Sequence, residues 1–190
     1  GHHLGVPAAD VPVTRICPTC PHAHGKPRMP GTGLEVSIAH TCGKVLLALT
    51  RVAQVGVDIE HLDPNLTPDQ LPTKVLNPAE RLPTEPADRT RAFLRYWTRK
   101  ESVVKASGIG LRSPLPDVIV TPHDLPARIL RFQQTFLPPI NIHDLEMGAD
   151  YLAAVSVLTP GPVEVTIHHL APGQRLLHTP LTTRKEPQCA

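Results

Sequence analysis

The chain has few aromatic residues and little net charge, and it contains no long apolar run. Aromatic residues make up 3% of the 190 positions, so the core must consist mainly of Val, Leu, Ile and Ala. A net charge of +2 gives no sign of a surface built for nonspecific nucleic-acid binding. A membrane-spanning helix needs roughly 18 or more apolar residues in succession. We therefore expect a protein that binds neither nucleic acid nor a membrane.

Cysteine is also scarce. The four cysteines, Cys17, Cys20, Cys42 and Cys189, are too few to predict a disulfide framework in a chain of this length. The first ten residues, GHHLGVPAAD, lack the basic start and apolar core of a secretory signal. Both observations favour a reduced, cytoplasmic protein.

Proline is abundant, at 23 residues, so we expect many proline-containing connections along the chain. The first group of predicted elements occupies residues 1–60, which we expect to form an N-terminal lobe. Alternating or branched apolar residues predict its strands, at 34–40, 45–49 and 55–60. A hairpin turn is predicted at 41–44, and 11–16 is a weaker strand candidate.

The second group occupies residues 61–190, the expected C-terminal lobe. The strongest helical pattern of the chain covers 88–106 and is followed by Gly108 and Gly110. A weaker helix is predicted near 76–82. Further strands are predicted at 117–120, 142–146 and 151–158. We therefore expect an α+β fold of two small lobes, each a sheet with a packed helix.

Residues 55–60, VGVDIE, place two acids on one face of a predicted strand. Side chains alternate along a strand, so the three branched residues face one way and Gly56, Asp58 and Glu60 the other. A glycine in a strand often marks a place where a ligand approaches the backbone. Taken alone, the stretch is also compatible with an edge strand that has a solvated acidic face.

The helix at 88–106 carries one acid on its apolar side. At about 100° per residue, Glu101 falls between Leu94 and Trp97, whereas the arginines Arg91, Arg95 and Arg99 lie on the opposite, solvated face. Burying an unpaired carboxylate costs several kcal/mol, so Glu101 needs a partner.

Two partners for Glu101 can be considered. An i,i+4 pair with Lys105 contributes only a few tenths of a kcal/mol when exposed. The alternative is a metal ion shared with Asp58 and Glu60, for which three oxygen ligands favour Mg²⁺. With Lys100, Lys105 and His40 nearby, such an ion would suit a pyrophosphate. The residues alone therefore indicate Mg²⁺-dependent phosphoryl-type transfer.

These two stretches resemble the motifs of the 4′-phosphopantetheinyl transferases of the surfactin-synthetase-activating type. The first motif corresponds to residues 55–60, VGVDIE, and the second to residues 97–105, WTRKESVVK. Weaker matches cover much of the remaining chain: Gly25-Lys-Pro27, Ser37-Ile-Ala-His40, Glu80 in Asn77-Pro-Ala-Glu80, Gly108-Ile-Gly-Leu111 and Tyr151-Leu-Ala-Ala-Val155.

The resemblance implies transfer of the 4′-phosphopantetheine arm of coenzyme A to a serine of an apo acyl, polyketide or peptidyl carrier protein. Adenosine 3′,5′-bisphosphate would be released. It implies that Asp58, Glu60 and Glu101 hold Mg²⁺, that Glu101 is the base, and that Lys105 stabilises the leaving phosphate. Lys26, His40 and Lys100 would also contact coenzyme A.

The resemblance also implies a pseudo-twofold pair of α/β lobes, each with a mainly antiparallel three-stranded sheet and a packed helix. The site would lie between the lobes of a monomer. A carrier protein would dock beside the site through its acidic helix, so we expect a basic or apolar surface there.

Two features depart from the family pattern. Ala39 stands where a serine often precedes the histidine, which removes one hydroxyl. The segment before the first motif is also shorter than usual, so we expect part of the N-terminal lobe to be missing from this sequence. A catalytically weak module that binds coenzyme A or a carrier protein is the alternative function. A generic Mg²⁺ phosphatase fits the lysines and the tryptophan less well.

A possible zinc site precedes the Gly-Lys-Pro stretch. Cys17-Pro-Thr-Cys20 is followed by His22 and His24, which supplies half of a common zinc-binding pattern. No second C-x₂-C follows, although four ligands are usual in structural sites. From the sequence alone we therefore favour a reduced loop that packs two thiols. Glu80 is open to two interpretations, a helix-surface acid or a direct role at the metal.

Overall fold

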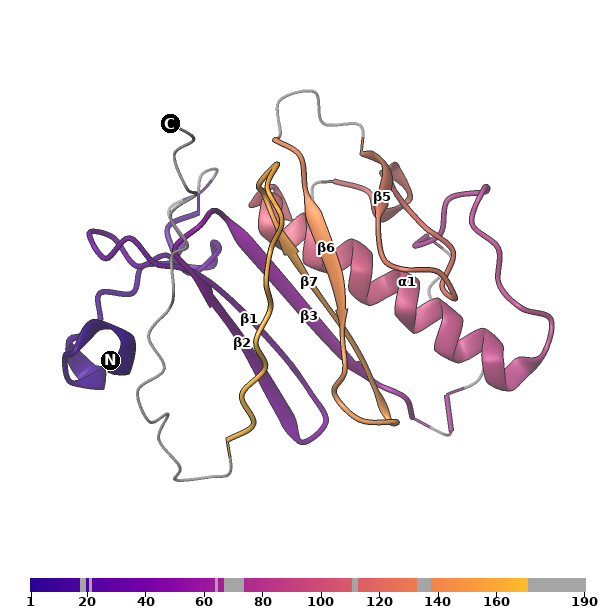
Figure 1. Cartoon of the computed structure of the whole chain (residues 1–190), viewed down its shortest axis with the longest axis horizontal. Helices are drawn as coiled ribbons and strands as arrows, with labels where there is room; N and C mark the ends of the chain where they lie inside the picture. The colour runs from indigo at the N-terminus through magenta and orange to yellow at the C-terminus, as the bar shows by residue number, and fades with distance from the viewer. Residues whose placement is uncertain are drawn as a thin grey trace, which may run out of the picture.

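The computed structural model describes residues 1–17, 20, 22–63, 65–66, 74–110, 113–132 and 138–170. In chain order its strands and α-helix are β1 (Glu35–Thr41), β2 (Lys44–Thr50), β3 (Val55–His61), α1 (Pro86–Ser107), β4 (Val118–Val120), β5 (Ile129–Phe132), β6 (Asn141–Leu145) and β7 (Tyr151–Val157). Short 3₁₀ turns cover His2–Leu4, Ala8–Asp10 and Leu115–Asp117. The predicted α+β class is confirmed: one helix packs on antiparallel sheets (Figure 1). None of the described helices is long and apolar enough to cross a membrane.

The central sheet has three antiparallel strands in the order β3-β7-β6. Helix α1 packs against β3 and β7, and Figure 1 shows it running along that sheet. Val57 and Ile59 belong to a core cluster that also contains Ala39 of β1 and Val155 of β7. The sheet is therefore covered by α1 and by side chains of the β1–β2 hairpin, which explains why β3 is buried along most of its length.

The hairpin attaches to the open edge of β3 through hydroxyl groups. Among the described strands, β1 pairs with β2 only, yet its Ser37 Oγ accepts the Val57 N–H at 3.1 Å and its Thr41 Oγ1 accepts the His61 N–H at 3.2 Å. Buried backbone donors need such partners, and an unpaired strand edge is prone to unwanted pairing. Two side chains of β1 thus take the place of backbone partners for β3.

Most predicted elements are confirmed. The hairpin turn contains Gly43 at φ 71° and the helix ends at Gly108, also at φ 71°, where a residue without a side chain avoids the strain of left-handed backbone. The predicted helix at 76–82 is wrong. The Asn77 side chain accepts the Ala79 N–H, and Glu80 N–H bonds to the Asn77 carbonyl, so local turns replace helical hydrogen bonds.

The pairing predicted for residues 55–60 is also wrong. We expected this strand to complete the β1–β2 sheet, whereas it pairs with β7, with Asp58 opposite Ala154. Strand β5 was not predicted, and 11–16 forms only an isolated bridge between Thr14 and Arg28. The lobe boundary at residue 60 and the pseudo-twofold relation stay predictions. Residues 171–190 and Leu111 lie outside the described part of the chain.

Candidate active site

Gly56 lets α1 approach β3 closely. A Cβ atom at this position would lie 2.0 Å from the Ser102 carbonyl oxygen and 2.2 Å from the Ala106 nitrogen. The sequence suggested that a ligand approaches this glycine, but the structure places the helix backbone there. The close approach brings the acid-bearing face of β3 against α1, so the acids do not form a solvated edge.

The spacing of the two elements explains which side chains meet. Trp97, Glu101 and Lys105 follow one another at i, i+4 and i+8, so they form one stripe along α1. The eight residue steps from Trp97 to Lys105 rise about 12 Å, whereas two strand residues span about 6.6 Å, so the long side chains at the two ends of the stripe reach inward. The stripe therefore runs alongside Glu60 and Asp58, with Trp97 bonding to Glu60 and Lys105 bonding to Asp58.

Asp58 is the most buried of the three acids. Its side chain is 6% exposed, and Oδ1 accepts a hydrogen bond from Lys105 Nζ at 2.6 Å. Its other oxygen, Oδ2, is buried with no hydrogen-bond partner. Burial raises the pKa of Asp58, and Lys105 opposes that rise. A buried carboxylate oxygen without a partner is rare and costly, and a cation would satisfy it.

The two glutamates share this environment. Burial, together with the negative charges of Asp58 and Glu101, raises the pKa of Glu60 to about 7, while Lys105 and Trp97 oppose the rise. Burial and the charge of Asp58 also raise the pKa of Glu101, again opposed by Lys105. Like charges held close in a half-buried place disfavour ionisation. Further positive charge would therefore stabilise the ionised form of the cluster.

The structure brings the three acids into electrostatic contact but not to ligand distance. Among the described residues, the one group of three potential metal ligands within 4.8 Å of one another is formed by Cys17, Cys20 and His24. Asp58, Glu60 and Glu101 would have to turn their carboxylates inward to bind one ion. Their donor chemistry fits Mg²⁺, which prefers carboxylate oxygens and retains waters, and Asp58 Oδ2 offers a ready ligand atom.

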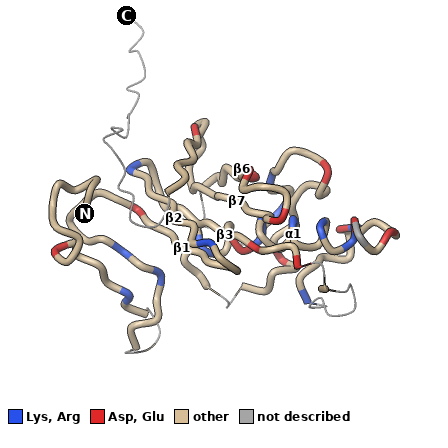
Figure 2. Tube along the Cα trace, turned by 90° about the horizontal axis from the view of Figure 1, so that it is seen from below, with Lys and Arg blue, Asp and Glu red and all other residues tan. Residues whose placement is uncertain are grey.

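Lys26 lies at the end of α1. Its Nζ donates to the Ala106 carbonyl at 3.2 Å, where the helix C-terminus favours a cation. Burial lowers the pKa of Lys26 to about 8, with Glu35 opposing and Arg28 adding to the shift. Figure 2 shows that basic residues predominate in the segment before β1. Lys26, which we predict to contact a phosphate, thus lies at the same end of α1 as Lys105.

His40 and Lys100 are not gathered with the acids. His40 is exposed and alternates with Ser37 and Thr41, whose side chains reach β3. It therefore lies on the opposite face of β1, and its predicted contact with coenzyme A stays a prediction. Lys100 is fully buried, and its Nζ lies 2.5 Å from Glu80 Oε2. It also donates to the Val75 and Leu115 carbonyls.

This arrangement corrects the prediction for Glu80, whereas the predicted contact of Lys100 with coenzyme A stays a prediction. Glu80 is not a helix-surface acid: its side chain is 3% exposed. Oε2 also accepts the Asn77 N–H and Oε1 accepts the Val120 N–H. Both ions have all their polar atoms engaged, so the pair ties α1 to β4 and to the turn at residue 77.

The predicted solvated arginine face is wrong at Arg99. This side chain is 0% exposed and forms a bidentate pair with Asp144 of β6, at 2.9 and 2.6 Å. Its remaining donors reach the carbonyls of Thr121, Pro122 and Leu125. Sequence analysis missed Asp144, because no local pattern links it to a residue 45 positions earlier. Helix α1 is therefore buried on two sides.

Comparison with known proteins places β3 and α1 within a region that matches a protein family. The sequence profile of the 4′-phosphopantetheinyl transferase superfamily matches residues 54–156. The chain is 30% identical over 145 residues to the 4′-phosphopantetheinyl transferase HetI of Nostoc sp., which covers 71% of this chain and 58% of that protein. It is 32% identical over 105 residues to the 4′-phosphopantetheinyl transferase AcpT of Salmonella typhi, covering 50% and 55%. The chain thus spans a little more than half the length of these relatives.

Proposed function

The chain belongs to the 4′-phosphopantetheinyl transferase superfamily, and on this premise we propose that it transfers the 4′-phosphopantetheine arm of coenzyme A to a serine of an apo carrier protein. The observation that carries the proposal is the stripe of Glu101 and Lys105 facing Asp58 and Glu60, within the matched region. The coenzyme A pyrophosphate would lie at this cluster, with Lys26 at the same end of α1.

A Mg²⁺ ion held by Asp58, Glu60 and Glu101 would neutralise charge on the pyrophosphate oxygens. The protein's own groups supply the rest. The carrier serine oxygen forms the new bond to phosphorus, and the phosphoanhydride bond breaks with its electron pair leaving on adenosine 3′,5′-bisphosphate. Glu101, whose pKa is raised by burial and by Asp58, accepts the serine proton as the general base.

Besides contacting the leaving phosphate, Lys105 would favour the ionised form of Asp58. Its bond to Asp58 Oδ1 opposes the effect of burial on the pKa of that acid. Asp58 is thereby favoured as a carboxylate, the form that can bind a metal. Lys26, with a pKa of about 8, is mostly charged at neutral pH and would be further favoured as a cation by a phosphate.

The test is the mass of an apo acyl carrier protein after incubation with the chain, coenzyme A and Mg²⁺. We expect a gain of one phosphopantetheine arm, lost on chelation and reduced at least about a hundredfold in Glu101→Gln, since a general base typically contributes 10²–10⁴-fold. Glu146→Gln is the matched control, because Glu146 is exposed and lies outside the cluster. Coenzyme A binding without transfer, for several carrier types, would instead favour the binding-module function.

A further inference from the structure

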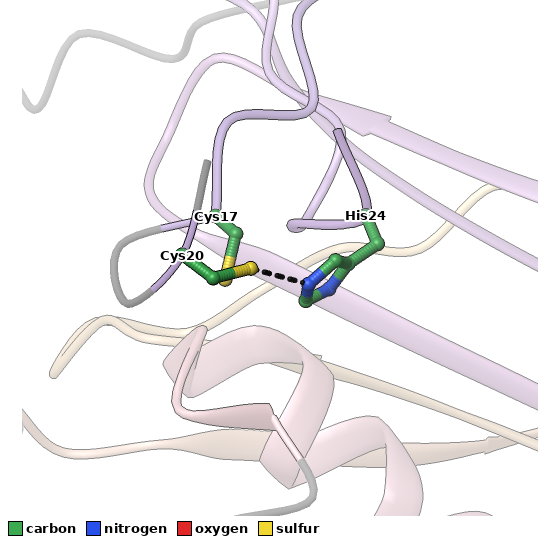
Figure 3. A group of neighbouring side chains, drawn as sticks. All are labelled: Cys17, Cys20 and His24. Atoms are coloured by element: carbon green, nitrogen blue, oxygen red, sulfur yellow. Dashed lines mark hydrogen bonds between the residues drawn. The ribbon is translucent and has the colours of Figure 1, made fainter. Parts of the chain in front are cut away.

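A second group of ligand-type side chains lies apart from the acid cluster, in the loop that precedes Lys26. Figure 3 shows Cys17, Cys20 and His24 pointing toward one another. Their ligand atoms all lie within 4.8 Å of each other, and Cys20 Sγ lies 2.9 Å from His24 Nε2 in a hydrogen bond. The sequence spacing is C-x₂-C-x₃-H, and nothing in the proposed transfer reaction uses it.

These distances suit a tetrahedral metal. Zn–S bonds of about 2.3 Å and Zn–N bonds of about 2.1 Å place tetrahedral ligand atoms roughly 3.5 to 3.8 Å apart. The Cys20–His24 distance of 2.9 Å is shorter than that spacing and the other distances are at most 4.8 Å, so side-chain rotations would bring the three atoms to it. Thiolate and imidazole ligands favour Zn²⁺ over the hard cations Mg²⁺ and Ca²⁺.

Packing does not explain the cluster, although packing of thiols was the explanation favoured from the sequence. A cysteine that serves as a small apolar residue is usually fully buried. Cys17 and Cys20 are only half-buried and His24 is exposed, and none of the three belongs to a described core cluster. Two thiols and an imidazole therefore meet at a surface where apolar contacts contribute little.

We propose that Cys17, Cys20 and His24 bind a zinc ion, with water as the fourth ligand. Both cysteines bind as thiolates, so binding releases their protons and weakens at low pH. His24 is the exposed member, which leaves the fourth position open to solvent. The proposal concerns metal binding alone and does not depend on the transferase activity.

The surrounding backbone shows what the ion would hold together. The two arms of the loop are joined by hydrogen bonds between Thr14 and Arg28 and by a bond from Gly25 N–H to the Arg15 carbonyl at 2.9 Å. A Cβ atom on Gly25 would lie 2.2 Å from the Ile16 carbonyl oxygen, so the arms are in direct contact. The zinc ion would link the two arms at the open end of this loop.

The loop places Lys26 against the C-terminal end of α1. Lys26 follows His24 by two residues, and its ammonium group bonds to the Ala106 carbonyl. A metal on the loop would restrict the backbone before that lysine and so lower the entropy lost when Lys26 is held at the helix end. The ion would thus have a positioning effect at a distance from the acids.

Cobalt substitution provides a direct test with the full chain. The protein, purified under reducing conditions and freed of metal by chelation, is titrated with Co²⁺ and then with Zn²⁺. We expect one thiolate-bound metal ion per chain, reported by intense thiolate-to-cobalt charge-transfer absorption, which Co²⁺ at the carboxylates does not give and which Zn²⁺ abolishes by displacement. Absence of that absorption in a chain with all thiols reduced would overturn the proposal.

Matched variants assign the ligands. Cys20→Ser and His24→Asn should each weaken Co²⁺ binding at least about tenfold, whereas Cys42→Ser, at an exposed cysteine outside the cluster, and His22→Asn should bind as the native chain does. Far-ultraviolet circular dichroism verifies that each variant is folded. If a variant does not fold, protection of the native thiols from alkylation by Zn²⁺ gives the answer. Equal alkylation rates with and without Zn²⁺, or loss of binding in His22→Asn but not in His24→Asn, would contradict the assignment.

Discussion

Replacing Glu60 with glutamine should stabilise the metal-free protein at neutral and higher pH. Glu60 has a pKa of about 7 against an ordinary value of 4.5. One pKa unit corresponds to 1.36 kcal/mol, so the difference between these two pKa values sets an upper limit of about 3.4 kcal/mol. The carboxylate is only part-buried, and solvent screening reduces the effect to about 1 to 2 kcal/mol. The glutamine removes the charge and keeps an oxygen for Trp97.

The sign follows from proton binding. Between about pH 4.5 and 7 the folded state holds the Glu60 proton and the unfolded state does not, so the free energy of unfolding of the native chain falls as the pH rises. The full penalty is present above pH 7 and is absent below pH 4.5. Glu60→Gln should therefore match the native chain near pH 4 and exceed it near pH 8, where Tm should rise by roughly 2–8 °C.

The measurement is thermal unfolding followed by circular dichroism, in EDTA and in excess Mg²⁺, from pH 4 to pH 8. An ion that binds only the folded state adds about 2.7 kcal/mol at a hundredfold excess over its Kd, so Mg²⁺ should stabilise the native chain and have much less effect on Glu60→Gln. Glu146→Gln controls for loss of a surface charge. A Glu60→Gln chain that is less stable than the native one at pH 8 in EDTA would refute the reasoning, as would a difference that does not change with pH.

Two further predictions concern the packing that supports the cluster. Gly56→Ala should lower the free energy of unfolding by about 3 kcal/mol or more, because the added Cβ would lie 2.0 Å from the Ser102 carbonyl oxygen and overpack the contact between β3 and α1. An unchanged midpoint of urea unfolding would contradict this, since it would show that α1 moves away without loss of stability. Glu80→Gln should cost about 3–5 kcal/mol by leaving the buried Lys100 without its counter-ion, and adding Lys100→Met should recover part of that loss. Denaturation of the single and double variants measures this coupling, and additive effects would contradict it.

The sequence predicts the acid cluster because local patterns contain it. Alternation on β3 gives Asp58 and Glu60 one face, and the helical period places Glu101 and Lys105 one turn apart on one stripe. Local patterns do not show that α1 packs against β3. That contact was predicted from the need of Glu101 for a partner. The role of Gly56 was mistaken for the same reason: a strand pattern cannot tell whether a ligand or a helix takes the free space.

The buried ion pairs could not be predicted in this way. Lys100 lies at the edge of the apolar arc, where a lysine is usually solvated, and its partner Glu80 comes from an irregular segment without periodicity. Arg99 likewise pairs with an acid that lies beyond two further strands in the chain. Such pairs depend on long-range packing of loops on α1. For the same reason β3 was placed in one sheet with β1 and β2, since nothing in its own residues identifies β7 as its neighbour.

Charge balance explains why the acid cluster should remain costly until a cation binds. Asp58, Glu60 and Glu101 carry three negative charges when ionised, and Lys105 supplies one positive charge, which leaves a net charge of −2. One divalent cation neutralises that remainder. Burial raises the pKa values of all three acids, and neighbouring carboxylates add to the rise at Glu60 and Glu101; Asp58 Oδ2 is buried with no hydrogen-bond partner. A pyrophosphate bound there would then lie against a neutral cluster, with Lys26 as a separate cation at the end of α1. The strain of the metal-free cluster and its fitness for a metal-bound phosphate therefore have the same physical origin.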